Sequence, residues 1–141
     1  MISDAHVGRT YPPTEPYVVS REKIAEFADA LGDDNPAYRG AAPVAPPTFA
    51  AVLAAKAWGG LFGDRELDMK LSQTIHGDQR FEWSRPLRAG DSVTATLSID
   101  KVRARGNTAF VTVSVALDAA GSTVCRAIST LVHTWPEGAT A

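Results

Sequence analysis

The chain has 141 residues with one cysteine, no long apolar run and no excess of basic charge. The single cysteine, Cys125, excludes an internal disulfide and any metal site built from several cysteines. It lies in a strand-like run, which favours a buried thiol over a nucleophile. No segment approaches the ~20 apolar residues of a membrane span, and Met1 to Gly8 lacks the apolar core of a signal peptide. These absences predict a soluble, cytoplasmic protein.

The charge composition argues against nucleic acid and anionic membranes as partners. Lys and Arg number 14 against 16 Asp and Glu, so the formal net charge is −2. Neither a linker nor an internal repeat divides the chain, and its length suffices for one sizeable core. We therefore expect a single domain over residues 1–141, with no metal and no cofactor.

The first half of the chain predicts two helices. Ser20 is a candidate N-cap and Gly32 a candidate C-terminal stop of the first helix. Its apolar stripe has the i, i+3, i+4, i+7 spacing of a helix: Ile24, Phe27, Ala28 and Leu31. The second helix runs from about Phe49 to Trp58, is apolar nearly all round, and should be buried on most sides. We expect Gly59-Gly60 to end it, and Leu61 to Leu71 to form an irregular connection.

The second half alternates between apolar and polar residues, as strands do. One short run with this pattern is Gln79, Phe81 and Trp83, and three longer runs are Val93 to Ile99, Val111 to Leu117 and Thr123 to Trp135. Tight turns join the three long runs, which predicts an antiparallel meander. The simplest fold is of the α+β class, with a curved antiparallel sheet wrapped around the buried second helix.

A motif-like segment follows the first helix: Gly32-Asp33-Asp34-Asn35-Pro36-Ala37-Tyr38. Two further segments are distinctive. Ala45-Pro46-Pro47-Thr48-Phe49 opens the second helix, and His76-Gly77-Asp78-Gln79 begins a stretch that continues through Arg85-Pro86 to Gly90-Asp91. In this order and spacing the chain resembles the MaoC-like (R)-specific hydratases and dehydratases. Within that family it is most similar to the N-terminal, non-catalytic-type domain of actinobacterial hydroxyacyl-thioester dehydratases.

The resemblance implies a single hotdog fold and the reversible loss of water from a (3R)-hydroxyacyl thioester. In the family's motif, G-D-x-N-P-x-His, the histidine takes the C2 proton and the aspartate handles the departing hydroxyl. Carried over, Asp33 keeps the acid position, but Tyr38 replaces the histidine. A phenol with a pKa of roughly 10 is a poor proton acceptor near neutral pH, whereas imidazole near 6.5 is a good one.

The resemblance also implies a substrate-binding set, formed by Asn35, Thr48, Phe49 and Gly77. In it a backbone N–H at the Thr48-Phe49 helix start polarises the thioester carbonyl. The segment from Arg39 to Val44 is shorter than the one that helps to cover the acyl tunnel in active hydratases.

Each candidate also has a simpler interpretation. Asp33 is either a catalytic acid or the carboxylate of an Asx-turn, and Tyr38 is either catalytic or a packing residue. His76 is either an alternative base, acting from the sheet side of the cleft, or a structural histidine. Three arginines either contact a phosphate of coenzyme A or of a carrier protein, or lie on a solvated strand edge: Arg80, Arg85 and Arg88. His6 and His133 have no motif-like spacing.

Two functions follow from the resemblance. In the first, the chain is part of a dehydratase whose substrate is an acyl-CoA or acyl carrier protein thioester. It is then either catalytic as a homodimer or, in the favoured form, the substrate-holding partner of a histidine-bearing subunit. In the second, it is a non-catalytic hotdog module that binds an acyl thioester or has a regulatory role. Open sheet edges predict a dimer, either a homodimer or a heterodimer with a second hotdog subunit. We expect Phe81, Trp83 and Val111 in or near the shared sheet.

Overall fold

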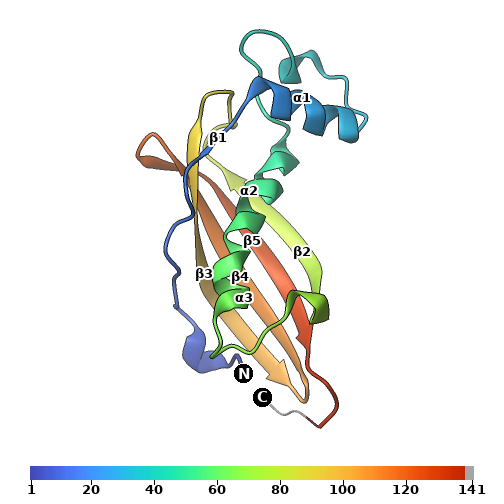
Figure 1. Ribbon diagram of the computed structural model, residues 1–141, viewed down its shortest axis with the longest axis vertical. Coiled ribbons are helices and arrows are strands. Elements are labelled where there is room, and N and C mark those ends of the chain that lie inside the picture. The colour runs from blue at the N-terminus through green and yellow to red at the C-terminus, as the bar shows by residue number, and fades with distance from the viewer. Residues whose placement is uncertain (139–141) are drawn as a thin grey trace.

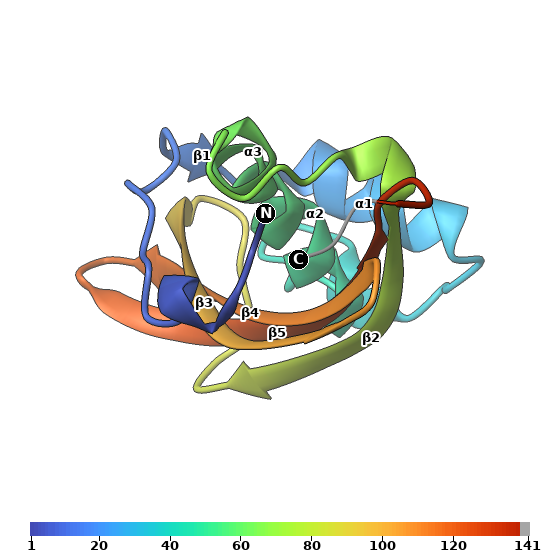
Figure 2. The ribbon, with the colours of Figure 1, turned by 90° about the horizontal axis from the view of Figure 1, so that it is seen from below.

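A five-stranded antiparallel sheet curls around a helical rod in the computed structural model, which describes residues 1–138 (Figures 1 and 2). The strand order is β1-β3-β4-β5-β2. The strands are β1 (Tyr17–Val18), β2 (Thr74–Trp83), β3 (Ser92–Arg105), β4 (Thr108–Ala119) and β5 (Ser122–Thr134). The helices are α1 (Arg21–Ala30), α2 (Ala50–Lys56) and α3 (Trp58–Gly63). The expected α+β hotdog architecture is confirmed.

The meander β3-β4-β5 has the predicted alternation. Inward-facing residues pair directly across the strands, for example Leu97 with Val115 and Val115 with Ala127, and all three are fully buried. Cys125 faces the same core and is 1% exposed, and its burial raises the pKa of the thiol to about 12. The prediction of a buried thiol is confirmed. Val111, expected near a shared sheet, is fully buried because its side chain faces the core, and its strand β4 is the central strand and not an edge.

The rod α2–α3 lies across the concave face of the sheet (Figure 2). It buries one side only, the stripe of Ala50, Leu53, Ala54 and Ala57. The expectation that this helix is buried on most sides is wrong, since Val52 is 38% exposed and Ala55 and Lys56 are also exposed. A single curled sheet contacts only one side of a rod. The other side remains an apolar surface in the isolated chain.

The two glycines after Trp58 do not end the rod, which corrects a second expectation. α3 continues through both of them to Gly63. The reason is a long-range contact, because the ring of Tyr11 packs directly over Gly60. A Cβ atom placed there would meet Tyr11 ring atoms at 3.0 to 3.1 Å. Gly60 therefore serves close packing inside a helix, a role that its sequence neighbours do not reveal.

Gly60→Ala should destabilise the protein by about 1–2 kcal/mol, because the added methyl displaces the Tyr11 ring. The free energy of unfolding from a urea titration measures this loss. Gly59→Ala is the matched control, since a Cβ at Gly59 meets nothing within 4 Å. In a helix this second change should stabilise by up to about 1 kcal/mol. Equal effects of the two substitutions would show that the contact with Tyr11 has no role.

The helix α1 has the predicted ends. Ser20 Oγ accepts the backbone N–H of Lys23 at 3.1 Å, and Gly32 adopts a positive φ of 66° after the last turn. Ile24 and Ala28 of the predicted stripe are fully buried, but Leu31 is 53% exposed. The buried part of the stripe thus ends before Leu31, because α1 covers only the end of the sheet. Leu61, Leu67 and Met69, in the expected irregular connection, instead belong to the core.

The sheet has one open edge, β2, and no strand of residues 1–138 lies beyond it. At the other edge the segment from Gly8 to Thr14 follows β3, with hydrogen bonds from the Gly8 N–H to the Ile99 carbonyl at 2.8 Å and from the Tyr11 N–H to the Leu97 carbonyl at 2.9 Å. Beyond Ile99 this N-terminal segment forms no backbone hydrogen bond to β3, but Asp4, in the 3₁₀ turn Asp4–His6, still lies against the end of β3. No helix in residues 1–138 combines the length and hydropathy that crossing a membrane requires.

His133 is a buried histidine that the sequence did not single out. It is 0% exposed on β5, with its ring edge-on to Trp135. Thr74 Oγ1 donates its only hydrogen to the Lys70 carbonyl, so it must accept from His133 Nδ1 at 2.8 Å. The Nε2 atom then carries a lone pair without a partner among the described residues. Burial lowers the pKa of this imidazole below its ordinary value.

The lowered pKa predicts a loss of stability in mild acid. The unfolded chain binds a proton near pH 6.5, while folded His133 resists it, so stability is full above that pH. It should fall by up to about 1.4 kcal/mol per pH unit as the pH drops further. His133→Phe should flatten this slope in urea titrations at several pH values. The matched control is His76→Gln, at a histidine that is exposed on the neighbouring strand, and an equal flattening by both substitutions would contradict a role for the burial of His133.

Candidate active site

Three of the predicted segments meet at one end of the molecule. The loop after α1, the start of the central rod and the turn that follows β2 lie together there (Figure 1). Two backbone hydrogen bonds tie them, from the Val44 N–H to the Ala37 carbonyl at 3.0 Å and from the Ala45 N–H to the Leu87 carbonyl at 2.8 Å. The short segment from Arg39 to Val44 therefore returns at once to the sheet.

The Asp33 loop is organised by its own side chains. Asp33 Oδ1 accepts the N–H of Asn35 at 3.1 Å, and Asn35 Oδ1 accepts the N–H of Ala37 at 3.0 Å. The Arg39 guanidinium donates to the Asp33 carbonyl at 2.9 Å. This is the Asx-turn arrangement that the simpler interpretation describes. The second oxygen of the Asp33 carboxylate makes no hydrogen bond to residues 1–138, and so remains available to a ligand.

Tyr38 ends a short 3₁₀ turn, Pro36–Tyr38, that Asn35 caps. Its side chain is half-buried against the core, and its hydroxyl has no hydrogen-bond partner within the described part of the chain. The ring lines a cavity of about 330 Å³ beside the first turn of α1. The other lining residues are Arg21, Glu22, Ala25, Arg39, Gly40 and Pro43.

The start of the rod separates the two residues that were expected to act together there. The N–H of Phe49 is used within a 3₁₀ turn, where it donates to the Pro46 carbonyl at 2.9 Å. Its side chain is fully buried, edge-on to Phe27 with ring centroids 5.3 Å apart. Thr48 is exposed, and its N–H makes no hydrogen bond to any described residue. Thr48 therefore offers the donor, while Phe49 anchors α1 onto the rod.

A second cavity, of about 260 Å³, adjoins this helix start. It is lined by Ala45, Pro47, Trp83, Ser84, Arg85 and Pro86. The wall is largely apolar and includes Trp83 from β2 and Pro47 from the 3₁₀ turn before α2. A cavity of this kind beside a free backbone N–H suits a group that is apolar at one end and has a carbonyl at the other.

Of the three arginines considered for phosphate binding, Arg85 is already occupied. Its guanidinium forms a two-pronged ion pair with Asp91, at 2.7 and 3.0 Å, across the turn after β2. Partial burial acts to raise the pKa of Asp91, but the Arg85 guanidinium holds that pKa below its ordinary value. Arg80 makes only a long contact of 3.5 Å with Glu82, and Arg88 is exposed. Arg85 therefore braces the turn and is not free for a phosphate.

His76 and Gly77 lie away from the Asp33 loop. They are near the beginning of β2, at a bulge between His76 and Asp78, whereas α1 and the loop after it lie at the other end of the molecule (Figure 1). The His76 ring is edge-on to Trp58, with ring centroids 5.1 Å apart. A single chain therefore does not bring His76 beside Asp33. Within residues 1–138, no three His, Cys, Asp or Glu side chains are grouped to hold a metal ion.

Comparisons with known proteins agree on one family and one fold. A family model described as "FAS1-like, dehydratase domain region" matches residues 5–127. A UPF0336 protein of Cutibacterium acnes is 57% identical over 138 residues, covering 97% of each chain.

Among solved structures, the C-terminally truncated HadBC complex of Mycobacterium tuberculosis, a 3R-hydroxyacyl-ACP dehydratase, contains a similar chain. The TM-score is 0.78 at 30% identity, over 90% of this chain and 96% of that one. A protein described as a MaoC-like dehydratase gives a TM-score of 0.81 at 27% identity, over 93% of this chain and 43% of that one. The similarity thus extends over nearly the whole chain.

Proposed function

The chain belongs to the FAS1-like dehydratase domain family, and from that premise we propose that it is the substrate-holding subunit of a (3R)-hydroxyacyl-thioester dehydratase. One observation carries the proposal. The loop with Asp33 keeps its motif turn, but the position of the general base is held by the phenol of Tyr38. No described histidine lies beside that loop. The chemistry then needs a histidine from a second subunit. We place the assembled enzyme in the cytoplasm, where acyl thioesters are metabolised.

In this scheme the partner's histidine removes the C2 proton of the substrate. The hydroxyl leaves C3 and takes up a proton from the aspartic acid of the partner's motif, so that it departs as water while the C2–C3 double bond forms. The proton that the histidine has removed then returns to that carboxylate. The negative charge that develops on the thioester oxygen needs a donor, and the free N–H of Thr48 is the candidate in this chain. The cavity between Pro47 and Trp83 is the candidate for holding the adjoining part of the acyl group.

Two open surfaces support a second hotdog subunit as partner. The outer edge of β2 is free, and free strand edges are commonly covered by pairing with a strand of another subunit. The outer side of the rod presents the apolar side chains of Val52 and Ala55, which a second subunit would cover. The similar HadBC structure is itself a complex of a 3R-hydroxyacyl-ACP dehydratase. We accordingly propose an acyl carrier protein or coenzyme A thioester as substrate.

The proposal is tested by measuring crotonyl-CoA hydration with the purified chain, with a hotdog subunit carrying the complete G-D-x-N-P-x-His motif, and with both. The mixture should exceed the rate of this chain alone by about 100-fold or more, the lower range for a positioned general base, and should also exceed the sum of the two separate rates. Full activity of this chain alone would contradict the substrate-holding role. Binding of the thioester without any gain in rate would instead favour a non-catalytic binding module.

A further inference from the structure

One cavity lies far from the Asp33 loop, along the end of β3. Its volume is about 730 Å³, and it is lined by Asp4, Lys101, Val102, Arg103, Ala104, Arg105, Phe110, Thr112 and Thr130. This is the end opposite α1, and the edge opposite β2, so neither surface used in the proposed function contributes to it. We call the segment from Lys101 to Arg105 the basic edge.

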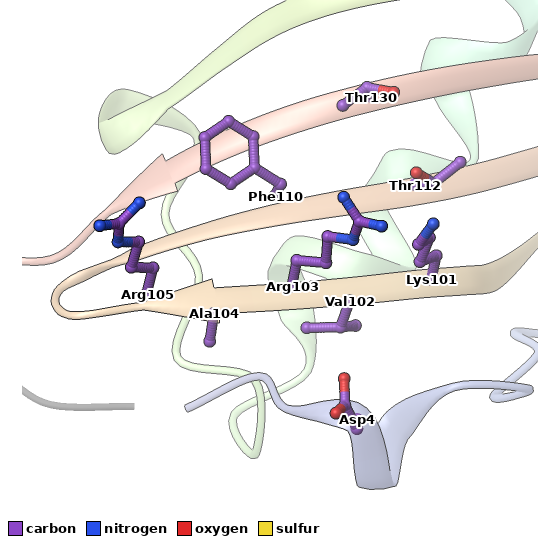
Figure 3. A pocket seen from close by; sticks show the side chains of 9 residues that line it. All are labelled: Asp4, Lys101, Val102, Arg103, Ala104, Arg105, Phe110, Thr112 and Thr130. Atoms are coloured by element: carbon purple, nitrogen blue, oxygen red, sulfur yellow. The ribbon is translucent and has the colours of Figure 1, made fainter.

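The cations of the basic edge share one face of the sheet. Lys101, Arg103 and Arg105 alternate along β3, which spaces them by about 6.7 Å, and all three are exposed. Figure 3 shows their side chains with Phe110 on one side of the sheet, and Asp4 with Val102 and Ala104 toward the other. None of the three cations forms an ion pair with a described residue.

An apolar row begins next to the central cation. Arg103 pairs across the sheet with Phe110, Phe110 with Val132, and Val132 with Ile75. Phe110 is 46% exposed and Ile75 69% exposed. Threonines flank this row, with Thr112 opposite Lys101 and Thr108 opposite Arg105. The face thus combines a line of positive charge with exposed apolar side chains behind it.

The backbone of the basic edge is also unpaired. Ile99, whose side chain points inward, directs its N–H and carbonyl away from β4 and bonds them to Arg9 and Gly8. Val102 and Ala104 also point inward, so their N–H and carbonyl groups face the same edge. No hydrogen bond from residues 1–138 reaches these groups across that edge. Ala104 is exposed, whereas Val102 is only 5% exposed and Asp4, in the 3₁₀ turn Asp4–His6, lies beside it, so the main-chain donors and acceptors are open at the Ala104 end of the basic edge.

We infer that the basic edge binds an acidic, extended segment of a partner protein, which adds to β3 as a further strand. Carboxylates at alternate positions of such a segment have the same spacing as the three cations. Its backbone would pair with the exposed Ala104, and with Val102 once the turn that carries Asp4 moves aside. A second copy of this chain fits poorly, because pairing the same edges would set Lys and Arg opposite one another. The inference does not depend on the dehydratase role.

The test uses a fluorescent peptide, acetyl-Glu-Val-Glu-Val-Glu-amide, titrated against the full chain. Arg103→Gln combined with Arg105→Gln should weaken binding about tenfold, and added salt should weaken the wild-type complex. Arg65→Gln combined with Lys70→Gln is the matched control. It removes the same charge from exposed sites elsewhere and should change binding less than about twofold. In NMR spectra the amide signals of Val102 and Ala104 should shift on binding.

Two further probes separate strand addition from general charge attraction. Acetyl-Glu-Pro-Glu-Pro-Glu-amide keeps the carboxylates but loses two N–H donors, and it should bind at least about tenfold more weakly. A short oligothymidylate tests a phosphate chain. The inference is overturned if either probe binds as tightly as the first peptide, or if the Arg103 and Arg105 double variant binds like wild type. It is also overturned if the first peptide fails to bind, since the charges then serve only to protect the edge.

Discussion

Tyr38→His should raise the enoyl-thioester hydration rate of the isolated chain by about 100-fold. The change places an imidazole where the loop now carries a phenol, and a positioned general base contributes ~10² to 10⁴ in rate. The rest of the loop is already in place, because Asn35 caps the turn that carries residue 38 and Asp33 keeps one free carboxylate oxygen. Crotonyl-CoA hydration at neutral pH measures the gain.

The control for this gain is Asp33→Asn in the Tyr38→His background, which should return the rate to that of wild type. The amide can still accept the Asn35 N–H through its oxygen, so the turn is kept while the carboxylate is lost. A Tyr38→His variant that folds but shows no gain would contradict the prediction. It would mean that the loop holds position 38 away from Asp33, and that geometry as well as residue type has diverged.

The second large effect concerns stability. Phe49→Ala should lower the free energy of unfolding by about 3–5 kcal/mol, because the ring is fully buried and packs edge-on against Phe27. The substitution removes the contact that holds α1 to the start of the rod. It should therefore also disturb the position of the Asp33 loop, which follows α1. Urea titration measures it.

Phe110→Ala is the matched control for Phe49→Ala. It makes the same chemical change on the outer face of the sheet, where the ring is 46% exposed, and should cost less than about 1 kcal/mol. Similar losses at the two positions would contradict the assignment of Phe49 as an anchor between α1 and the rod.

Caps, turn residues and the alternation of apolar and polar residues predicted those parts of the fold and the site that depend on neighbours in the sequence. The Ser20 cap, the helix stop at Gly32 and the Asx-turn at Asp33 each depend on residues within a few positions, so the sequence was sufficient to predict them. The alternation in β3 to β5 predicted the meander for the same reason, since a strand with one buried face repeats every two residues.

What the sequence did not predict depends on contacts between distant segments. The rod continues through Gly60 because Tyr11 packs on it, and no local rule brings those residues together. His133 continues the inward series of Ser129 and Leu131, a signal that was present, but its hydrogen bond to Thr74 follows from the pairing of β2 with β5. The basic edge at Lys101 to Arg105 becomes visible only once the strand order is known.

The most direct test of the division of labour uses the assembled enzyme, with one substitution in each subunit. Tyr38→Phe in this chain should leave kcat within about twofold, because the phenol takes no part in proton transfer. Replacing the motif histidine of the partner subunit by alanine should lower kcat by ~10² to 10⁴. A large loss of kcat with Tyr38→Phe, together with little loss in the histidine variant, would contradict the assignment of this chain as the substrate-holding subunit.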